Sequence, residues 1–349
     1  FFFPIFKQLL LVFLWVVLNK SKNNMLLGTT DHIEIIEKLD LSIVPKGQIT
    51  RYWLRLVRDG MGVYMNVPLI VAKGYEAGKT VGITAAVHGN ELNGIPVIQR
   101  LFKEIDVQCL KGAIVGVPVV NIPSLLRKKR RFVDGSDLNH IMPGKPNGTV
   151  SQVYAWRVVE RIIKQLDFLV DLHTASNGRV NSYYIRADMA DETVRKMALL
   201  QNAQIIVHNP PNDGTLRGTA DELGISAITL EVGDPNLFQK GMIRDGLTGI
   251  HNLLGYFGIT DSEVEEQSED TVICKKSYWI YTDTGGLLTV HPKVSEMVKK
   301  GQVIATLRNI FGDLIKEYHA PEDGIVIGKS VSPVNQTGGR ILHLGVVRK

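Results

Sequence analysis

The chain has 349 residues, 44% hydrophobic and 21% charged, with a formal net charge of +5 and a pI near 9.0. This is the composition of an ordinary globular protein long enough for two domains. Its two cysteines, Cys109 and Cys274, lie far apart and show no CxxC spacing, which argues against a disulfide framework and favours a reducing compartment.

The chain opens on an apolar leader, residues 1–24. Its uninterrupted apolar run, Leu9–Leu18, is shorter than the about 20 residues that span a bilayer. The run has the length of a signal-peptide core, but no Ala-x-Ala-like cleavage site follows it. We expect a cytoplasmic protein if Met25 is the true start. If residues 1–18 are a real signal, the protein is exported or membrane-anchored, so membrane contact depends on the leader.

Residues 25–260 alternate between strand and helix patterns. Strands are predicted at residues 48–57, 65–72, 81–87, 113–120, 167–172, 182–186, 204–207 and 226–230, with turns at 58–60 and 74–79. Helices are predicted at residues 92–105, 151–166, 191–203 and 237–257. This alternation predicts an α/β fold with a mixed, mostly parallel sheet flanked by helices.

The last part of the chain has a different pattern. Residues 261–270 are charged and lack an apolar period, which predicts a linker. Residues 271–349 show short strand patterns separated by glycine turns, which predicts a small all-β domain, a barrel or a sandwich.

Three polar side chains follow predicted strands of the α/β domain. His88 and Glu91 occupy a strand-to-helix turn, and His173 ends another apolar strand. Sites form beyond the carboxyl ends of strands in such sheets. Two imidazoles and a carboxylate suit a catalytic zinc, which leaves a fourth position for water. The HxxE spacing alone is weak, because His and Glu at helix ends are more often caps or surface residues.

Glu231 also follows an apolar strand. A carboxylate beside an apolar wall has the raised proton affinity that a general base needs, although a helix cap or a surface position is the simpler interpretation. Asp171 and Asp167, near His173, are candidate hydrogen-bond partners for a ligating imidazole.

The long polar segment at residues 121–144 contains the basic run Arg127–Arg131. Long connections of this kind tend to be functional. Arg130 is a candidate cation for an oxyanion, and Asn139 for a substrate contact. The simpler alternatives are a solvated loop cation for Arg130 and a turn or cap for Asn139. The run is short and has no interleaved aromatic residues, so it does not predict nucleic-acid binding.

Together these motifs resemble the succinylglutamate desuccinylase/aspartoacylase family of carboxypeptidase A-like zinc hydrolases. The resemblance covers about residues 81–258. It is carried by His88-Gly-Asn-Glu91, Asn121-x-Pro123, Arg130, Asp134-Gly-x-Asp137-Leu-Asn139, Pro143-Gly144, Asp171-Leu-His173 and Thr229-Leu-Glu231-x-Gly233. The C-terminal Gly285-Gly286-Leu287 and His319–Gly324 resemble the β-domain of such deacylases.

The resemblance implies a zinc-dependent amidohydrolase that cleaves a small N-acylated amino acid or related amine. It implies one Zn²⁺ on His88, Glu91 and His173, with Glu231 as general base. Arg130 would polarise the carbonyl, with Arg127 or Arg131 as substitutes. The substrate would contact residues of the loop, namely Asn121, Arg127, Asn139 and His140.

One departure from the family pattern matters most, and a smaller one is Ser124-Leu125, where relatives often have Gly-Phe. Relatives usually have Asp-Leu-Asn-Arg, whose arginine clamps a substrate carboxylate, whereas this chain has His140. A bidentate guanidinium is therefore missing there. Either Arg179, Arg186 or Arg217 compensates, or the substrate lacks that carboxylate, and we hypothesise that His140 weakens selection for anionic substrates.

Two other functions remain open: a metallocarboxypeptidase acting on peptides, and a non-catalytic small-molecule-binding protein of the same fold. The missing clamp and the β-domain, which would narrow the cleft, argue against the first. The second predicts loss of a ligand or the base, and neither is lost. We expect a small-molecule partner, no nucleic acid and a homo-oligomer.

Overall fold

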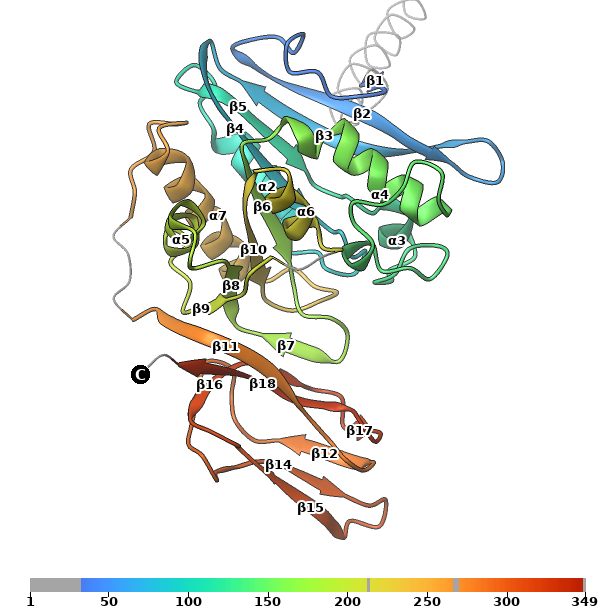
Figure 1. Cartoon of the computed structure of the whole chain (residues 1–349), viewed down its shortest axis with the longest axis vertical. Helices are drawn as coiled ribbons and strands as arrows, with labels where there is room; N and C mark the ends of the chain where they lie inside the picture. The colour runs from blue at the N-terminus through green and yellow to red at the C-terminus, as the bar shows by residue number, and fades with distance from the viewer. Residues whose placement is uncertain (1–32, 212–213, 266–269, 348–349) are drawn as a thin grey trace, which may run out of the picture. The chain divides into compact units, whose positions relative to one another are not determined.

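The computed structural model describes residues 33–211, 214–265 and 270–347 (Figure 1). The residues from 36 onward form one compact unit. The predicted leader, residues 1–24, lies outside the described residues, as do residues 266–269 of the predicted linker. No helix in the described part of the chain combines the length and the apolar character that a bilayer-spanning helix needs.

Four consecutive strands open the described part of the chain, and helices separate most of the later strands up to residue 260. The strands are β1 (Glu34–Ile36), β2 (Gln48–Arg58), β3 (Tyr64–Lys73), β4 (Glu76–Ala85), β5 (Lys111–Val117), β6 (Phe168–His173), β7 (Arg179–Asn181), β8 (Tyr183–Ala187), β9 (Ile205–His208) and β10 (Ser226–Val232). The helices are α2 (Gly94–Glu104), α3 (Ile122–Leu126), η1 (Leu138–His140), α4 (Val150–Arg161), η2 (Ile163–Gln165), α5 (Glu192–Leu199), α6 (Leu216–Glu222) and α7 (Lys240–Tyr256).

One mixed sheet runs through this region in the order β2-β3-β5-β4-β6-β10-β8-β9. Its centre, β5-β4-β6-β10, is parallel, whereas β2, β3 and β5 pair antiparallel and β8 runs antiparallel to β10. The prediction of a mixed sheet with flanking helices is confirmed. Because β4, β6 and β10 are parallel neighbours, their carboxyl ends meet at one edge of the sheet.

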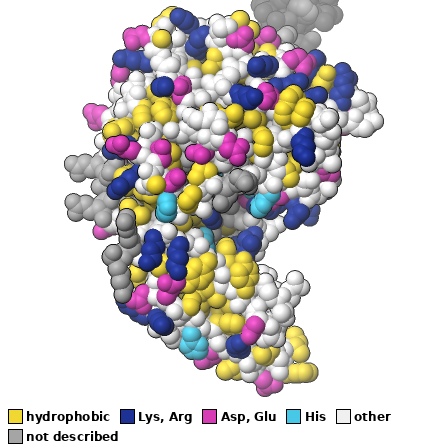
Figure 2. All heavy atoms as spheres, in the orientation of Figure 1, with side chains coloured by type: hydrophobic (Ala, Val, Ile, Leu, Met, Phe, Trp, Pro, Cys, Tyr) yellow, Lys and Arg dark blue, Asp and Glu magenta, His cyan; other side chains and the backbone are white. Residues whose placement is uncertain are grey.

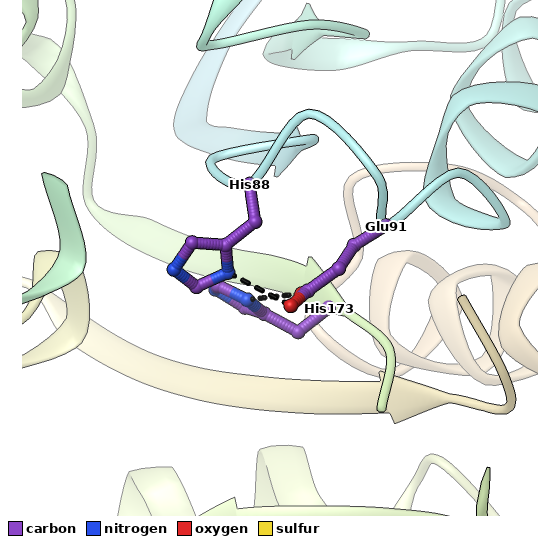
Figure 3. Close-up of side chains that lie close together, drawn as sticks. All are labelled: His88, Glu91 and His173. Atoms are coloured by element: carbon purple, nitrogen blue, oxygen red, sulfur yellow. Dashed lines mark hydrogen bonds and ion pairs between the residues drawn. The ribbon is translucent and has the colours of Figure 1, made fainter. Parts of the chain in front are cut away.

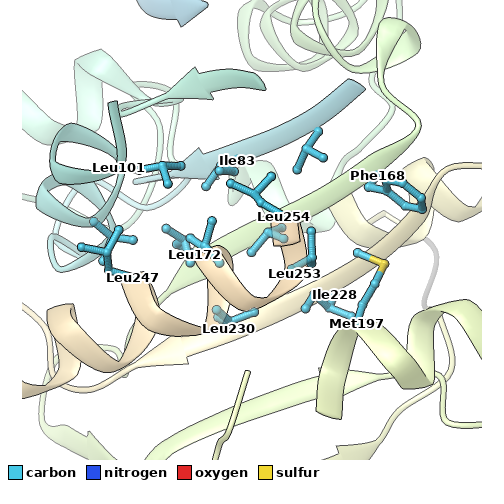
Figure 4. Close-up of a cluster of buried hydrophobic side chains, with 14 of the residues drawn as sticks. Ile83, Leu101, Phe168, Leu172, Met197, Ile228, Leu230, Leu247, Leu253 and Leu254 are labelled. Carbon is cyan, nitrogen blue, oxygen red and sulfur yellow. The ribbon is translucent and has the colours of Figure 1, made fainter. Parts of the chain in front are cut away.

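Two apolar cores cover the two faces of this sheet. Successive strand residues point to opposite faces, so Val170 packs in the core under α2, α5 and α7, while Leu169 packs in the core under α4 and α6. Figure 4 shows the first core, with Leu253 and Leu254 of α7 packed against the central strands. Burial on both faces explains why β6 begins with three consecutive apolar residues, Phe168–Val170.

The C-terminal region is built of strands. They are β11 (Val272–Tyr281), β12 (Gly286–Val290), β13 (Met297–Val298), β14 (Val303–Arg308), β15 (Leu314–His319), β16 (Gly324–Ser330), β17 (Val334–Asn335) and β18 (Arg340–Val347). Strand β11 pairs parallel with β9, so the main sheet continues as β11-β18-β16-β13, and β15-β14-β12-β17 form a second sheet. The predicted all-β character is confirmed for the described residues from 271 to 347. The domain boundaries at residues 260 and 271 stay a prediction.

Some short elements escaped the sequence analysis. Helices α3 and α6 have five and seven residues, too few for a helical period to emerge. Strand β7 has three residues and pairs with β16 from the far end of the chain, a partner that local pattern does not reveal. The turn predicted at residues 74–79 is wrong, because β4 already begins at Glu76, where its side chains are exposed and polar.

Candidate metal centre

The three predicted zinc ligands meet at the carboxyl edge of the central strands. His173 is the last residue of β6, and His88 and Glu91 lie in the turn between β4 and α2 (Figure 3). One candidate ligand atom from each residue lies within 4.8 Å of the others. Nδ1 of His88 is 3.0 Å from Oε1 of Glu91, and Nδ1 of His173 is 3.0 Å from Oε2. All three side chains are buried.

The local backbone explains how the turn presents its side chains. Ala86 adopts a left-handed conformation, with φ at 52°, which turns the chain out of β4. Gly89 then packs so closely on α3 that a Cβ atom there would lie 2.0 Å from the carbonyl carbon of Ser124. The glycine of the His-Gly-Asn-Glu motif is therefore required by close backbone approach.

Each imidazole also contacts a second carboxylate through its Nε2 atom. Nε2 of His173 lies 2.7 Å from Oδ2 of Asp171, and Nε2 of His88 lies 2.9 Å from Oδ1 of Asp137. Asp171 also accepts a hydrogen bond from the Thr84 hydroxyl at 2.6 Å. A ring whose Nε2–H donates to a carboxylate keeps a lone pair on Nδ1, so both lone pairs face Glu91.

This arrangement fits a divalent cation. The buried Nδ1 of His88 has no hydrogen-bond partner within the described residues, although Glu91 lies beside it. Two neutral imidazole nitrogens and one carboxylate are ligand types that zinc binds, and hydrogen-bonded outer carboxylates are usual for ligating histidines. The donor set is therefore complete for a three-ligand metal site.

Glu91 is ionised in this environment. Burial alone would raise the pKa of its carboxyl group, but the imidazoles of His88 and His173 lower that pKa well below its usual range. Its oxygens also accept from Nη1 of Arg130 at 2.8 Å and from the backbone N–H of Thr174 at 3.1 Å.

Glu231, in β10, lies next to the candidate metal site. In the pairing of β10 with β6, Glu231 is the direct neighbour of His173. Its Oε2 accepts from the Asn181 amide at 3.2 Å, and its Oε1 lies 3.6 Å from Nε of Arg186. Burial raises the pKa of Glu231, while Arg186 and His173 oppose the rise. Such a carboxylate accepts a proton more readily than an exposed one.

A cavity of about 620 Å³ opens over this centre. It is lined by the three candidate ligands, by Glu231 and by the loop residues Arg130, Arg131, Asn139 and His140. Arg130 donates to Glu91, Asp137 and Ser176, and its side chain is 31% exposed. The structure therefore brings together residues from four separate segments that the sequence analysis had singled out.

Other predicted residues lie elsewhere. Asn121 is buried, where its amide caps α3 and donates to the carbonyl of Val87, and Arg127 donates to the carbonyl of Phe132. Neither is among the described residues that line the cavity, so their contacts give no support to a substrate-binding role.

The two aspartates predicted to contact a ligating imidazole have different partners. Asp171 holds His173 as expected, whereas Asp167, at the opposite end of β6, pairs with Lys79. Asn139 lines the cavity while its side-chain oxygen accepts from the backbone of Leu216, so it also acts as a structural link.

Several cavity residues were not predicted. Asp137 belongs to a motif that the sequence analysis names, but its hydrogen bond to His88 was not predicted. The available signal was its position two residues before Asn139. Trp279, Arg340 and His343 come from β11 and β18 and also line the cavity. Their role follows from the pairing of distant strands, which local sequence does not show.

Known proteins share sequence and fold with this chain. The model of the succinylglutamate desuccinylase/aspartoacylase catalytic domain matches residues 77–257, just over half of the chain. The N-alpha-acetyl-L-2,4-diaminobutyric acid deacetylase of Halomonas elongata is 23% identical over 276 residues, which cover 75% of this chain and 80% of that protein. A succinylglutamate desuccinylase of Pseudomonas aeruginosa is 26% identical over 172 residues, or 45% of this chain, and the match spans about half of its length, 52%.

Solved structures share the fold. The product-bound ectoine utilization protein EutE (DoeB) of Ruegeria pomeroyi superposes with a TM-score of 0.79 at 21% identity, covering 87% of this chain and 98% of that one. A succinylglutamate desuccinylase/aspartoacylase of Rhodobacter sphaeroides gives the same TM-score and identity, covering 90% and 100%. With the family model matched across the metal centre and the fold shared over most of its length, this chain belongs to the succinylglutamate desuccinylase/aspartoacylase family.

Proposed function

We propose that the chain is a zinc-dependent deacylase that hydrolyses the amide bond of a small N-acylated amino acid or related amine. The observation that carries the proposal is the convergence of His88, Glu91 and His173, with both imidazoles aimed inward by buried carboxylates. Membership of a family whose named relatives include deacetylases and desuccinylases supports the same reaction class.

The metal would be held by His88, Glu91 and His173, and when bound it would acidify a water molecule and polarise the scissile carbonyl. Glu231 lies beside this position and takes the proton of the attacking water, because its raised pKa makes it a better base than an exposed carboxylate. The same carboxyl group then donates that proton to the leaving amine.

Arg130 supplies fixed positive charge for the oxygen that becomes anionic. Its guanidinium group is held by Glu91, Asp137 and Ser176, so it needs little reorganisation during the reaction. A cation preorganised at the edge of a buried site stabilises developing charge more strongly than one in water.

The cavity favours a small substrate over a peptide. Trp279, Arg340 and His343 from the C-terminal strands form part of the wall around the metal centre. This wall, formed by β11 and β18, limits the length of peptide that the cleft accepts, which argues against a carboxypeptidase. The presence of all three ligands and of Glu231 argues against a binding protein that has lost its chemistry.

The test is a screen of N-acetyl, N-succinyl and N-formyl amino acids and diamines with zinc-reconstituted protein, using Glu231→Gln as the blank. We expect the wild type to release free amine and the variant to lose at least about 10²-fold in kcat. The variant should still bind one zinc per chain. Activity equal to that of the wild type in Glu231→Gln, or no zinc bound by the wild type, would contradict the proposal.

A further inference from the structure

Strand β7 connects the C-terminal strands to the cavity. In the described part of the chain β7 pairs with β16, and the pairing places Gly328 opposite Asn181 (Figure 1). Two hydrogen bonds extend the contact beyond β7, because the backbone N–H and the hydroxyl group of Ser182 both donate to the carbonyl of Ile327, at 2.9 and 3.0 Å. Ser182 and Ile327 are 145 positions apart in the sequence. The segment that carries Asn181 is therefore attached to a strand from the far end of the chain.

Asn181 is buried, and its amide group contacts Glu231. Nδ2 of Asn181 donates to Oε2 of Glu231 at 3.2 Å, and Asn181 lines the cavity over the candidate metal centre. Nε of Arg186 lies 3.6 Å from Oε1, which is longer than a hydrogen bond. A donor on one carboxylate oxygen fixes the orientation of the whole group. A neutral amide does so without the positive charge that would make the carboxylate a weaker base.

The position of Asn181 is fixed from two sides. Its backbone N–H donates to Oδ1 of Asp234 at 3.1 Å, and Gln239 donates to Oδ2 of the same carboxylate at 2.9 Å. Asp234 comes three residues after Glu231, so this contact ties Asn181 to the end of the strand that carries Glu231. On the other side, a Cβ atom at Gly328 would lie 2.2 Å from Oδ1 of Asn181. The asparagine side chain therefore packs on the backbone of β16.

This close approach requires a glycine at residue 328. Gly328 is buried but is not among the described residues that line the cavity. A Cβ atom there would also lie 2.8 Å from the backbone carbonyl oxygen of Val180, so rotation of the Asn181 side chain alone would not relieve the contact. A larger residue at this position must displace β7, and with it the amide group that contacts Glu231.

We propose that Asn181 is a positioning residue for the carboxylate of Glu231, and that β16 sets its place through Gly328. A reacting group displaced by about 1 Å can lose about 10²-fold in rate, because the reaction depends on the distance and alignment of the reacting atoms. The C-terminal strands then contribute to the hydrolytic step as well as to the cavity wall. The inference rests on the proposed function, in which Glu231 takes the proton of the attacking water, and assigns a further residue to that step.

The charged surface of the C-terminal strands is separate from this contact. Strand β11 contains the exposed Lys275 and Lys276, and dark-blue Lys and Arg side chains gather over it in Figure 2. Asn181 and Gly328 are instead buried. Asn181→Ala and Gly328→Ala therefore leave the surface charge unchanged, so an effect of either variant on kcat does not arise from weaker attraction of a charged substrate.

A double-mutant cycle tests the positioning role. We measure kcat and KM for the fastest substrate among N-acetyl, N-succinyl and N-formyl amino acids and diamines, in Asn181→Ala and Asn181→Asp, each alone and combined with Glu231→Gln. Asn181→Asp keeps the shape of asparagine but lacks the N–H donor. Each single variant should lower kcat about 10-fold or more while KM changes less than about 2-fold, and should have little further effect on Glu231→Gln. An equal loss of kcat in both backgrounds would show that Asn181 acts independently of Glu231 and would overturn the inference.

A matched pair of glycine variants tests the contribution of β16. Gly328→Ala puts a methyl group against Asn181, whereas Gly324→Ala puts one 2.5 Å from the carbonyl oxygen of Gly345, at the other end of the strand. Circular dichroism and zinc titration check that both variants fold and bind the metal. We expect Gly328→Ala to lower kcat about 10-fold with KM unchanged, and Gly324→Ala to keep the wild-type kcat. Equal kcat values in the two variants would show that β16 acts through stability alone and does not position Asn181.

A stability measurement gives a readout other than activity. The methyl group of Gly328→Ala meets Oδ1 of Asn181, an atom that Asn181→Ala removes. In urea denaturation the double variant should therefore lose less stability than the sum of the two single losses, and additive losses would contradict the contribution of β16. If the wild type hydrolyses none of the compounds, the proposed function fails and the role of Asn181 fails with it. If Glu231→Gln loses activity but both Asn181 variants keep the wild-type kcat, the proposed function stands and the inference fails.

Discussion

Asp171 and Asp137 contact the imidazoles of His173 and His88 through Nε2. Substitution of these carboxylates should weaken zinc binding without unfolding the protein. Asp171→Asn replaces the acceptor that holds Nε2 of His173 at 2.7 Å with a group of the same shape. Loss of such an outer carboxylate typically costs 10- to 100-fold in metal affinity. We expect zinc affinity, measured by competition with a chromophoric chelator, to fall by about that factor.

A matched control lies directly before the same strand. Asp167→Asn makes the same chemical change at the opposite end of β6, where the carboxylate pairs with Lys79 instead of a histidine. Its zinc affinity should equal that of the wild type. Equal affinities for Asp171→Asn and Asp167→Asn would show that the hydrogen bond to His173 does not tune the metal site.

His140 stands where the sequence analysis expects the family motif to have an arginine. It is exposed and lines the cavity, so a longer side chain fits there without displacing core residues. His140→Arg should raise kcat/KM for N-acyl aspartate or glutamate about 10-fold, because it adds a guanidinium able to pair with a carboxylate. His319→Arg, on β15, is the control. An unchanged ranking of substrates would sink the hypothesis that His140 weakens anion selection.

At the scale of the element, the turn between β4 and α2 depends on a glycine. A Cβ atom at residue 89 would meet the backbone of Ser124 and Leu125 at 2.0–2.3 Å. Backbone atoms of α3 cannot rotate away as a flexible side chain can, so Gly89→Ala should lower the free energy of unfolding by roughly 3 kcal/mol. Gly241→Ala is the control, since a Cβ there meets nothing within 4 Å. Urea denaturation measures both, and equal midpoints would contradict the predicted clash.

Elements of strong period were predictable, and short ones were not. Strand β6 and helix α2 begin and end within two residues of their predicted limits. The apolar pattern of a buried strand or an amphipathic helix is visible in its own sequence. Strand β7 carries no such signal, since its pairing with β16 is decided by residues about 150 positions away. For the same reason the convergence of His88, Glu91 and His173 could be predicted from strand ends, whereas the approach of Trp279 and Arg340 could not.

At the scale of the whole molecule, the candidate metal centre joins segments that are far apart in the chain. The turn containing His88 lies about 85 residues from His173, and Asp137 reaches the site from the intervening loop. A ligand that binds only the folded state stabilises every segment that its site connects. Zinc should therefore stabilise the unit as a whole and not only its local surroundings.

We expect zinc at about 100 times its Kd to add about 2.7 kcal/mol to the free energy of unfolding. For a chain of 349 residues that corresponds to a rise in Tm of roughly 4 °C. Differential scanning calorimetry with zinc and with a chelator measures the shift. Glu231→Gln should keep it, because Glu231 is not one of the three proposed ligands, whereas His173→Ala should lose most of it. His319→Ala is the matched histidine control. A shift that persists in His173→Ala would place the stabilising zinc at another site and would remove the physical basis of the proposed hydrolase.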